Sequence, residues 1–355
     1  MGARPSYRML GGFTAAALVA AFAVSAAPSA RADAVADFYS GKQLTVLVGY
    51  GAGGGYDTTT RLLAKHLSKH VPGNPTIIVQ NMPGAGSMRA ANFLFNAAPK
   101  DGTTLGVFAS STALEPLFGN DKAKFDPRKF EWIGSMHQDT ASCAIWEGGG
   151  QGIRNLDDLV KAKKEVVFGS TSPAAITSQH ALVLQHYLGA PVKVVYGYKG
   201  TKEVSLAMQQ GEAHASCGMF ESSVKGAFAE HIQSGKMKIM VQFGPDKAVE
   251  YFGDATRLYD RMKKPEDRQV LDVIFRQTQL ARPLAAPPGT PADRVAALRK
   301  AMLAAFADPE LVADGERLKI DFAPLSGDEA QALIEKFYAT PPELIKQAAA
   351  LIGRE

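Results

Sequence analysis

A glycine-rich run follows the first strongly apolar stretch of the chain, and it limits what the chain can fold into. Residues 44–48 have the pattern of a buried β-strand, the run from Gly49 to Asp57 has glycine at five of its positions, and a helical pattern begins near Thr58. A strand, a glycine turn and a helix N-terminus together present unpaired backbone N–H groups and the positive end of the helix dipole. The sequence therefore predicts an anion-binding loop.

The first 32 residues have the pattern of a secretory signal peptide. Arg4 and Arg8 form a positive segment, residues 9–27 are mostly apolar, and Ala30-Arg31-Ala32 is a small-x-small cleavage site. We expect cleavage before Asp33 and a periplasmic mature protein. An uncleaved anchor helix is the alternative, because the apolar stretch is nearly long enough to cross a membrane.

Charge and cysteine content restrict the classes of partner. The chain has 39 Lys and Arg against 35 Asp and Glu, a formal charge of +4. Three of these arginines lie in the signal peptide, so the mature chain is nearly neutral and no nucleic-acid partner is expected. Cys143 and Cys217 lie in short strand-like runs. They either form a disulfide in an oxidising compartment or are two buried small hydrophobic residues.

Strand and helix patterns alternate along the rest of the chain. Apolar strand-like runs at 76–80, 104–108, 166–168 and 192–196 each end in a turn rich in glycine or hydroxyl residues. Such alternation is typical of α/β folds, in which helices flank mostly parallel sheets. About 320 residues remain after the signal peptide, more than one core usually organises, so we expect two domains.

Gly, Ser and Thr gather where these strands end. The clusters fall into an early set, 53–58, 84–87 and 110–112, and a middle set, 170–179 and 198–201. Ligands of open α/β sheets bind beyond the carboxyl ends of the strands. Two sets on two domains therefore predict a ligand-binding cleft between the domains.

Five motifs have the order and spacing found in one known family. They are Gly53-Gly54-x-x-Asp57, Asn81-x-Pro83-Gly84-Ala85-Gly86, Ser178-Gln179-His180, Tyr198-Lys199-Gly200 and Ala286-Pro287-x-Gly289-Thr290-Pro291. With them the mature chain resembles the Bug-type extracytoplasmic solute-binding receptors of tripartite tricarboxylate transporters. The resemblance implies a two-lobed Venus flytrap fold, monomeric and without catalytic activity or cofactor. It also implies capture of a small organic carboxylate in the periplasm for a permease with one large and one small membrane subunit.

The resemblance implies a ligand site made by loops of both lobes, with no metal. Backbone amides of the first lobe and ordered water would hold one carboxylate, while the second lobe contacts the rest of the ligand. The implied first-lobe residues are Gly53, Gly54, Gly84, Ala85 and Gly86, and the implied second-lobe residues are Ser170, Thr177, Ser178 and Lys199. Tyr50, Tyr198, Asp57, Ser110 and Ser111 are added from their positions at strand ends.

Several of these residues have a structural alternative. Asp57 either contacts the ligand or caps the helix that follows, and its carboxylate would repel an anion unless water or an amide intervened. Lys199 either pairs with ligand charge or is a solvated turn residue. Tyr50 and Tyr198 either line the cleft or pack within their own lobes.

Other function classes have weaker support. Gly49-x-Gly51-x-x-Gly54 matches a dinucleotide fingerprint, but Asn81 stands where the acidic ribose ligand is expected. His66 and His70 have the i, i+4 spacing of a zinc site without a third ligand nearby, which indicates two surface histidines. The runner-up is a secreted enzyme acting on a carboxylate or phosphate ester, although no nucleophile and base pair is evident. In a third alternative, the ligand-bound form docks a sensor kinase.

The chain departs from the family pattern in three places. Residues 49–52 replace a proline-rich lead and Ala213-His214 replaces a Val-Asp pair, which leaves the identity of the ligand open. The charged segment 245–270 is longer than usual and is expected to be a surface elaboration. The predicted organisation is a signal peptide at 1–32, a first lobe at 33–137 and 242–355, and a second lobe at 138–241. Hinges are expected near 135–139 and 241–245.

Overall fold

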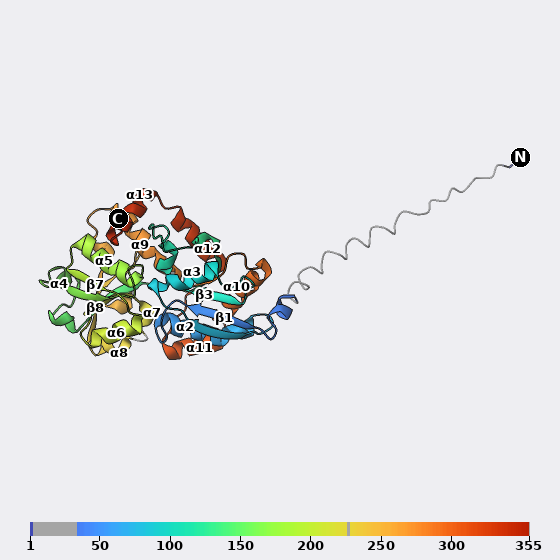
Figure 1. The fold of residues 1–355 in the computed structure, drawn as a ribbon, viewed down its shortest axis with the longest axis horizontal. Helices are drawn as coiled ribbons and strands as arrows, with labels where there is room; N and C mark the ends of the chain where they lie inside the picture. Colours follow the sequence, from blue (N-terminus) through green and yellow to red (C-terminus); the bar gives the residue numbers. More distant parts are fainter. Residues whose placement is uncertain (3–33, 226–227, 355) are drawn as a thin grey trace.

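A computed structural model of the chain describes residues 1–2, 34–225 and 228–354. The predicted signal peptide and its cleavage site lie outside the described residues, apart from Met1 and Gly2. Within the described ranges, the strands form two six-stranded sheets. Figure 1 shows these sheets in the two halves of the molecule, with helices on their faces. The α/β class predicted from the sequence is confirmed.

The first sheet has the strand order β12-β4-β11-β3-β1-β2. Its strands are β1 (Gln43–Val48), β2 (Thr76–Asn81), β3 (Thr104–Val107), β4 (Glu131–His137), β11 (Ala281–Ala286) and β12 (Leu325–Ser326). β1 pairs in parallel with β2 and β3, whereas β11 runs antiparallel to both of its neighbours. The flanking helices are α2 (Gly55–Leu67), α3 (Met88–Asn96), α10 (Ala292–Phe306), α11 (Pro309–Leu318) and α12 (Gly327–Tyr338).

The second sheet has the order β10-β9-β5-β8-β6-β7. Its strands are β5 (Ala141–Trp146), β6 (Val166–Gly169), β7 (Val192–Val195), β8 (Ala215–Phe220), β9 (Met237–Gln242) and β10 (Thr256–Arg257). β6 is parallel to β7 and β8, and β5 is antiparallel to β8 and β9. Its helices are α4 (Leu156–Val160), α5 (Ile176–Leu188), α6 (Thr201–Gln209), α7 (Glu221–Lys225), α8 (Ala229–Gln233), α9 (Asp267–Phe275) and α13 (Pro342–Leu351).

Short 3₁₀ helices join many of these elements. They are η1 (Ser68–His70), η2 (Ala85–Ser87), η3 (Ser110–Leu114), η4 (Pro127–Lys129), η5 (Glu147–Gly150), η6 (Glu250–Phe252), η7 (Leu258–Arg261) and η8 (Arg276–Leu280). Cys143 of β5 and Cys217 of β8 form a disulfide across the second sheet. No helix in the described part of the chain has the length and apolar character needed to cross a membrane.

The chain crosses between the sheets at adjacent segments. It leaves the first sheet after His137 and enters β5 at Ala141, and it returns through η8 into β11. The Asp139 amide N–H donates to the Thr278 carbonyl at 3.1 Å, and Ala281 pairs with His137, so the two crossings lie side by side. After residue 241 the chain remains in the second sheet, where β10 pairs with β9. The lobe limits and hinges given by the sequence stay predictions.

The C-terminal helices connect the two halves. Ser326 and Glu329 form a capping box at the start of α12, which packs on β4. Helix α13 then packs against α9 and α5 beside the second sheet. Beyond it, Arg354 Nη1 lies 2.7 Å from Oε2 of Glu115, a fully buried residue next to η3. Burial raises the pKa of Glu115 even though Arg354 and Asn120 lower it.

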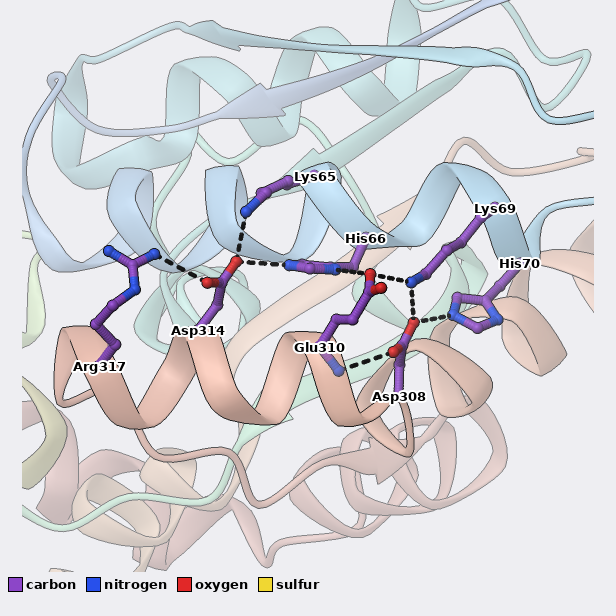
Figure 2. Close-up of polar contacts among 8 residues, drawn as sticks. All are labelled: Lys65, His66, Lys69, His70, Asp308, Glu310, Asp314 and Arg317. Atoms are coloured by element: carbon purple, nitrogen blue, oxygen red, sulfur yellow. Dashed lines mark hydrogen bonds and ion pairs between the residues drawn. The ribbon is translucent and has the colours of Figure 1, made fainter.

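A charged seam fixes α2 against α11, as Figure 2 shows. His66 Nε2 lies 2.9 Å from Asp314 Oδ2, and His70 Nε2 lies 2.8 Å from Asp308 Oδ2. The expectation of two surface histidines is wrong for His66, which is only 4% exposed because α11 covers it. Lys69 Nζ lies 2.6 Å from carboxylate oxygens of Asp308 and Glu310, so an ammonium group already balances these acids.

Candidate functional site

The first loop ends in the N-terminus of α2. The helix begins at Gly55, three residues before the position expected from the sequence. The N-cap residue Gly54 has extended backbone angles (φ −84°, ψ 170°) and supplies no side-chain cap. The first-turn amides therefore remain available to an anion in front of the helix.

Asp57 organises this loop from behind. Its Oδ2 accepts from the Gly53 amide at 2.8 Å, and its Oδ1 accepts from Arg61 Nε at 2.9 Å and from Asn81 Nδ2 at 2.8 Å. Asn81 Nδ2 also donates to the Tyr50 carbonyl at 2.9 Å. Burial raises the pKa of Asp57, but the donors from Arg61, Gly53 and Asn81 outweigh it and hold that pKa below its usual range. The geometry matches the capping alternative, and direct ligand contact stays a prediction.

The second loop turns its backbone in an unusual way. Gly84, Ala85, Gly86 and Ser87 have φ values of 141°, 50°, 63° and 73°, four positive values in succession. Ser87 Oγ accepts from the Ala109 amide at 2.7 Å, which ties the loop to the end of β3. Consecutive amides in such conformations form a concave nest that binds anions. The sequence motif thus becomes a second amide cradle beside the first.

Ser110 and Ser111 lie behind the cradles. Both are buried in η3, and neither hydroxyl makes a hydrogen bond to another described residue. They do not line the cavities described below, so their role as ligand contacts stays a prediction. Thr112 of the same cluster donates to the Gly86 carbonyl at 3.2 Å, so part of the hydroxyl cluster holds the second loop.

Hydroxyl side chains of the second lobe face these loops. Ser170 Oγ lies 2.7 Å from Thr177 Oγ1, and Ser178 Oγ donates to the Pro173 carbonyl at 3.3 Å. Thr171 and Ser172 have buried hydroxyls that make no hydrogen bond to a described residue. A Cβ atom at Gly86 would collide with Ser172 Oγ, so the second loop touches the opposite lobe.

A backbone hydrogen bond joins the lobes. The Gly51 amide N–H donates to the Lys199 carbonyl at 2.9 Å, so the structure is a closed form. The Lys199 side chain is 69% exposed, and its Nζ lies 3.9 Å from Glu203 Oε1. The side chain thus has the position of the solvated-turn alternative, whereas the peptide carbonyl makes the interlobe contact. Tyr198 is half-buried, with its ring near Gly169.

Three cavities surround this contact. The loop cavity, about 390 Å³, is lined by Gly84, Arg89, Thr171 and Tyr198 among others. The mouth cavity, about 610 Å³, is lined by Gly53, Lys202, Leu206 and neighbours. The deep cavity, about 30 Å³, shares Tyr50 and Thr171 with the loop cavity. Of the predicted ligand residues, Tyr50, Gly53, Gly54, Gly84, Ala85, Gly86, Thr177, Tyr198 and Lys199 line a cavity, and Asp57, Ser110, Ser111, Ser170 and Ser178 do not.

Arg282 is a cavity residue that sequence reasoning missed. It comes from β11, is 2% exposed, and lines the deep cavity. Its guanidinium carbon lies 5.2 Å from the ring centre of Phe220 and 5.8 Å from that of Tyr56. Burial raises the pKa of Tyr56 to about 12, even though Arg282 lowers it, so this hydroxyl is neutral at physiological pH. The signal in the sequence is a single arginine inside the apolar run 280–286.

A family model of known receptors matches most of this chain. The chain matches TctC, the tripartite tricarboxylate transporter family receptor, over residues 59–349. The chain belongs to this family. The receptor is therefore a solute-binding protein and not an enzyme, and the resemblance found in its motifs is confirmed.

Two curated relatives are each 26% identical to the receptor. A UPF0065 protein in the gbd 5′ region of Cupriavidus necator aligns over 242 residues, 66% of this chain and 68% of that protein. A UPF0065 protein of Bordetella bronchiseptica aligns over 306 residues, 84% of this chain and 81% of that protein.

Solved structures show the fold of the receptor. The periplasmic binding protein BugD has a TM-score of 0.70 at 20% identity, covering 87% of this chain and 98% of BugD. MatC from Rhodopseudomonas palustris, solved with bound malate, has a TM-score of 0.67 at 19% identity, covering 88% and 99%. An R. palustris protein solved with adipate has a TM-score of 0.68 at 16% identity, covering 86% and 97%. The two-lobed periplasmic-binding-protein fold is confirmed.

Proposed function

We propose that the receptor binds a small organic carboxylate in the cleft between its lobes. One observation carries the proposal: two amide cradles of the first lobe face the hydroxyl groups of the second lobe across a closed cleft. No Asp or Glu is among the residues that line the loop cavity or the deep cavity. Arg89 and Lys199 in the loop cavity and Arg282 in the deep cavity add positive charge. Malate and adipate, bound by two structural neighbours, belong to the same ligand class.

The receptor holds its ligand mainly through fixed dipoles. The α2 N-terminus and the nest at 84–87 point partial positive charge at the carboxylate, and ordered water fills the gaps. Closure removes the ligand from bulk water. These dipoles act more strongly in the closed cleft, because its effective dielectric constant is lower than that of water. The proposed contacts are Tyr50, Gly53, Gly54, Gly84, Ala85, Gly86, Thr177, Tyr198 and Lys199. Asp57 and Ser170 position Gly53 and Thr177 through hydrogen bonds, and ligand contact by Asp57, Ser110, Ser111, Ser170 and Ser178 stays a prediction.

Ligand entry requires the lobes to separate. The deep cavity, about 30 Å³, has room for one or two water molecules in the closed form. We place the hinge at the paired crossings 137–141 and 278–281, and extend the second lobe to the return crossing, because β10 pairs with β9 beyond residue 241. In this arrangement, opening of the lobes breaks the Gly51–Lys199 hydrogen bond.

The receptor acts as a monomer in the periplasm after removal of residues 1–32. It passes its ligand to a permease with one large and one small membrane subunit, as its family assignment suggests.

Thermal unfolding of the processed receptor, purified from the periplasm and stripped of ligand by unfolding and refolding, tests the proposal. A specific mono-, di- or tricarboxylate should raise the midpoint, since a ligand at a hundred times its Kd adds about 2.7 kcal/mol. Stabilisation by NAD or a phosphate ester alone would refute the proposal.

A matched pair of glycine variants locates the site. Gly86→Ala should weaken carboxylate binding by about tenfold or more, because the added Cβ collides with Ser172 in the closed form. Gly189→Ala is the control, since it has a similar positive φ of 76° with nothing within 4 Å of the added atom. Equal effects of both variants would place the ligand elsewhere.

A further inference from the structure

We propose that the seam between α2 and α11 is a binding site for one divalent transition-metal ion, such as Zn²⁺. The protein ligands would be His66 of α2 together with Asp308 and Glu310 at the start of α11, and water would complete the coordination. One potential ligand atom of each of these residues lies within 4.8 Å of those of the other two. Figure 2 shows the three side chains pointing toward one another between the two helices.

The sequence contains this site in two separate pieces. His66 and His70 have the spacing of a metal-binding pair, but the chain around them offers no third ligand. The packing of α11 on α2 places Asp308 and Glu310 beside the histidines, although these acids lie 238 residues or more further along the chain. The fold therefore supplies the ligands that the local sequence lacks.

His66 has one ring nitrogen available to a metal. Its Nε2 lies 2.9 Å from Asp314 Oδ2, and Lys65 and Arg317 also donate to this carboxylate and favour its ionised form. An ionised carboxylate only accepts, so Nε2 carries the proton of the neutral ring and Nδ1 carries the lone pair. Nδ1 lies 3.9 Å from Glu310 Oε2 and makes no hydrogen bond to another described residue. A carboxylate behind a histidine in this way is typical of metal sites.

The start of α11 holds the two acids at the seam. Asp308 caps the helix, and its Oδ1 accepts from the Glu310 amide at 3.0 Å, so Oδ2 is the oxygen that faces α2. His70 Nε2 lies 2.8 Å from this Oδ2 and fixes its direction. The Glu310 side chain is 74% exposed, so it can rotate toward an ion that enters from solvent. A tetrahedral ion with bonds of about 2.1 Å holds its ligand atoms about 3.4 Å apart, so small side-chain rotations complete the site.

Lys69 has the position that the metal would take. Its Nζ lies 2.6 Å from Asp308 Oδ2 and 2.6 Å from Glu310 Oε2, so the two acids already share one cation. The Lys69 side chain is 44% exposed, and an ion pair this open to water contributes little stability. The ammonium group can therefore turn into solvent when a doubly charged ion replaces it. Lys69 and the metal compete for the same oxygens.

The donor atoms favour a transition metal over the harder cations. Imidazole nitrogen is a good ligand for zinc, copper and nickel, whereas Ca²⁺ and Mg²⁺ prefer sites made of oxygen atoms alone. His66 lies near the C-terminal end of α2, about 17 Å along the helix from the glycine loop at its N-terminus. Metal binding should therefore clamp α2 against α11 and leave carboxylate affinity unchanged.

Calorimetric titration with Zn²⁺ tests the proposal. The processed receptor, prepared without a histidine tag and freed of metal with a chelator that is then removed, should bind one Zn²⁺ per chain. Its thermal midpoint should rise with Zn²⁺ concentration, because the ion binds the folded seam. Ca²⁺ at the same concentrations should bind much more weakly and leave the midpoint unchanged.

Variants of the seam assign the ion to its ligands. His66→Gln and Glu310→Gln should each weaken Zn²⁺ binding by about 10- to 100-fold, and Asp314→Asn, which changes a positioning residue, by about tenfold. His186→Gln is the control, because it removes an exposed histidine of α5 and should leave the affinity unchanged. If His66→Gln does not fold, Glu310→Gln still tests the site, since its side chain is mostly in solvent.

A lysine variant separates a metal site from an ordinary ion-pair seam. Lys69→Met removes the competing ammonium group and should strengthen Zn²⁺ binding by about tenfold. Lys238→Met is the control, because Lys238 has a similar exposure of 46% and pairs with Asp254 at 2.8 Å. A seam with a purely structural role would lose thermal stability in Lys69→Met and gain no affinity for Zn²⁺.

The other outcomes overturn the proposal. Absence of saturable Zn²⁺ binding in the wild type, or Ca²⁺ binding as tight as that of Zn²⁺, excludes a site with an imidazole ligand. Equal affinities of the wild type, His66→Gln and Glu310→Gln place the ion elsewhere on the chain. Unchanged affinity in Lys69→Met excludes an ion between Asp308 and Glu310. None of these results bears on carboxylate binding, which is measured separately in metal-free buffer.

Discussion

His180 makes the receptor sensitive to acid. The residue lies on α5, is fully buried, and its ring is 4.5 Å from that of Phe243 and 4.8 Å from that of Phe275. Neither ring nitrogen makes a hydrogen bond to another described residue. Burial lowers the pKa of His180 from 6.5 to about 3, because the charged imidazolium would lose its hydration among apolar rings.

The sign and size of the effect follow from linkage. The unfolded chain binds a proton at His180 near pH 6.5, whereas the folded chain does so near pH 3, so this contribution to stability is present above pH 6.5 and is lost as the pH falls. Between pH 7 and pH 4.5 the loss is about 2.5 kcal/mol, with a limiting slope of about 1.4 kcal/mol per pH unit.

Urea unfolding of the wild type and of His180→Phe, at pH values from 7 to 4.5, measures this contribution. Carboxylates titrate in both proteins, so the difference between their free energies of unfolding isolates the histidine. The difference should shift by about 2.5 kcal/mol over this range in favour of the variant. His186→Gln, at an exposed position on the same helix, should show a much smaller shift. A difference that stays constant with pH would refute the reasoning.

Three further predictions concern the loop, the disulfide and the seam. Asp57→Ala removes the acceptor that fixes the first loop, so calorimetry should show carboxylate affinity reduced by about tenfold. Reduction of Cys143–Cys217, which closes a separation of 74 residues, should lower the free energy of unfolding by about 4 kcal/mol in urea titrations. Asp314→Asn weakens the seam between α2 and α11, so its thermal midpoint should fall, and by less in high salt. Each prediction is refuted if the measured quantity (carboxylate affinity, free energy of unfolding or thermal midpoint) equals that of the untreated wild type.

The sequence predicted the loops better than the side chains around them. Loop positions follow from local chemistry, because the glycines at 84 and 86 permit the positive φ values of the nest. The sequence left two roles open for Asp57, helix capping and ligand contact. The hydrogen bonds that its carboxylate accepts from Gly53, Arg61 and Asn81 in the structure favour capping. Ser110 looked equivalent to other loop hydroxyls, yet its short helix turns it into the first lobe.

Long-range contacts account for what the sequence did not predict. The neighbours of the Arg282 side chain are Gly55, Phe220 and Ser223. They lie far from Arg282 along the chain, so the sequence around Arg282 does not indicate them. His66 looked like a surface residue because its covering helix begins more than 240 residues later. The hinge near 241–245 stays a prediction, and no local signal in the sequence shows that β10 pairs with β9 beyond that segment.

The bond between Gly51 and Lys199 joins two peptide groups and involves no side-chain atom. Truncation of the Lys199 side chain would therefore not remove it, and Gly51→Ala would add a Cβ 3.2 Å from Lys199 Cβ, so an ester in place of the residue 51 amide is needed to measure its strength. The same property separates two kinds of evolutionary change. Substitutions of side chains around the cleft can alter which solute is recognised while the hydrogen bond between these two peptide groups is kept.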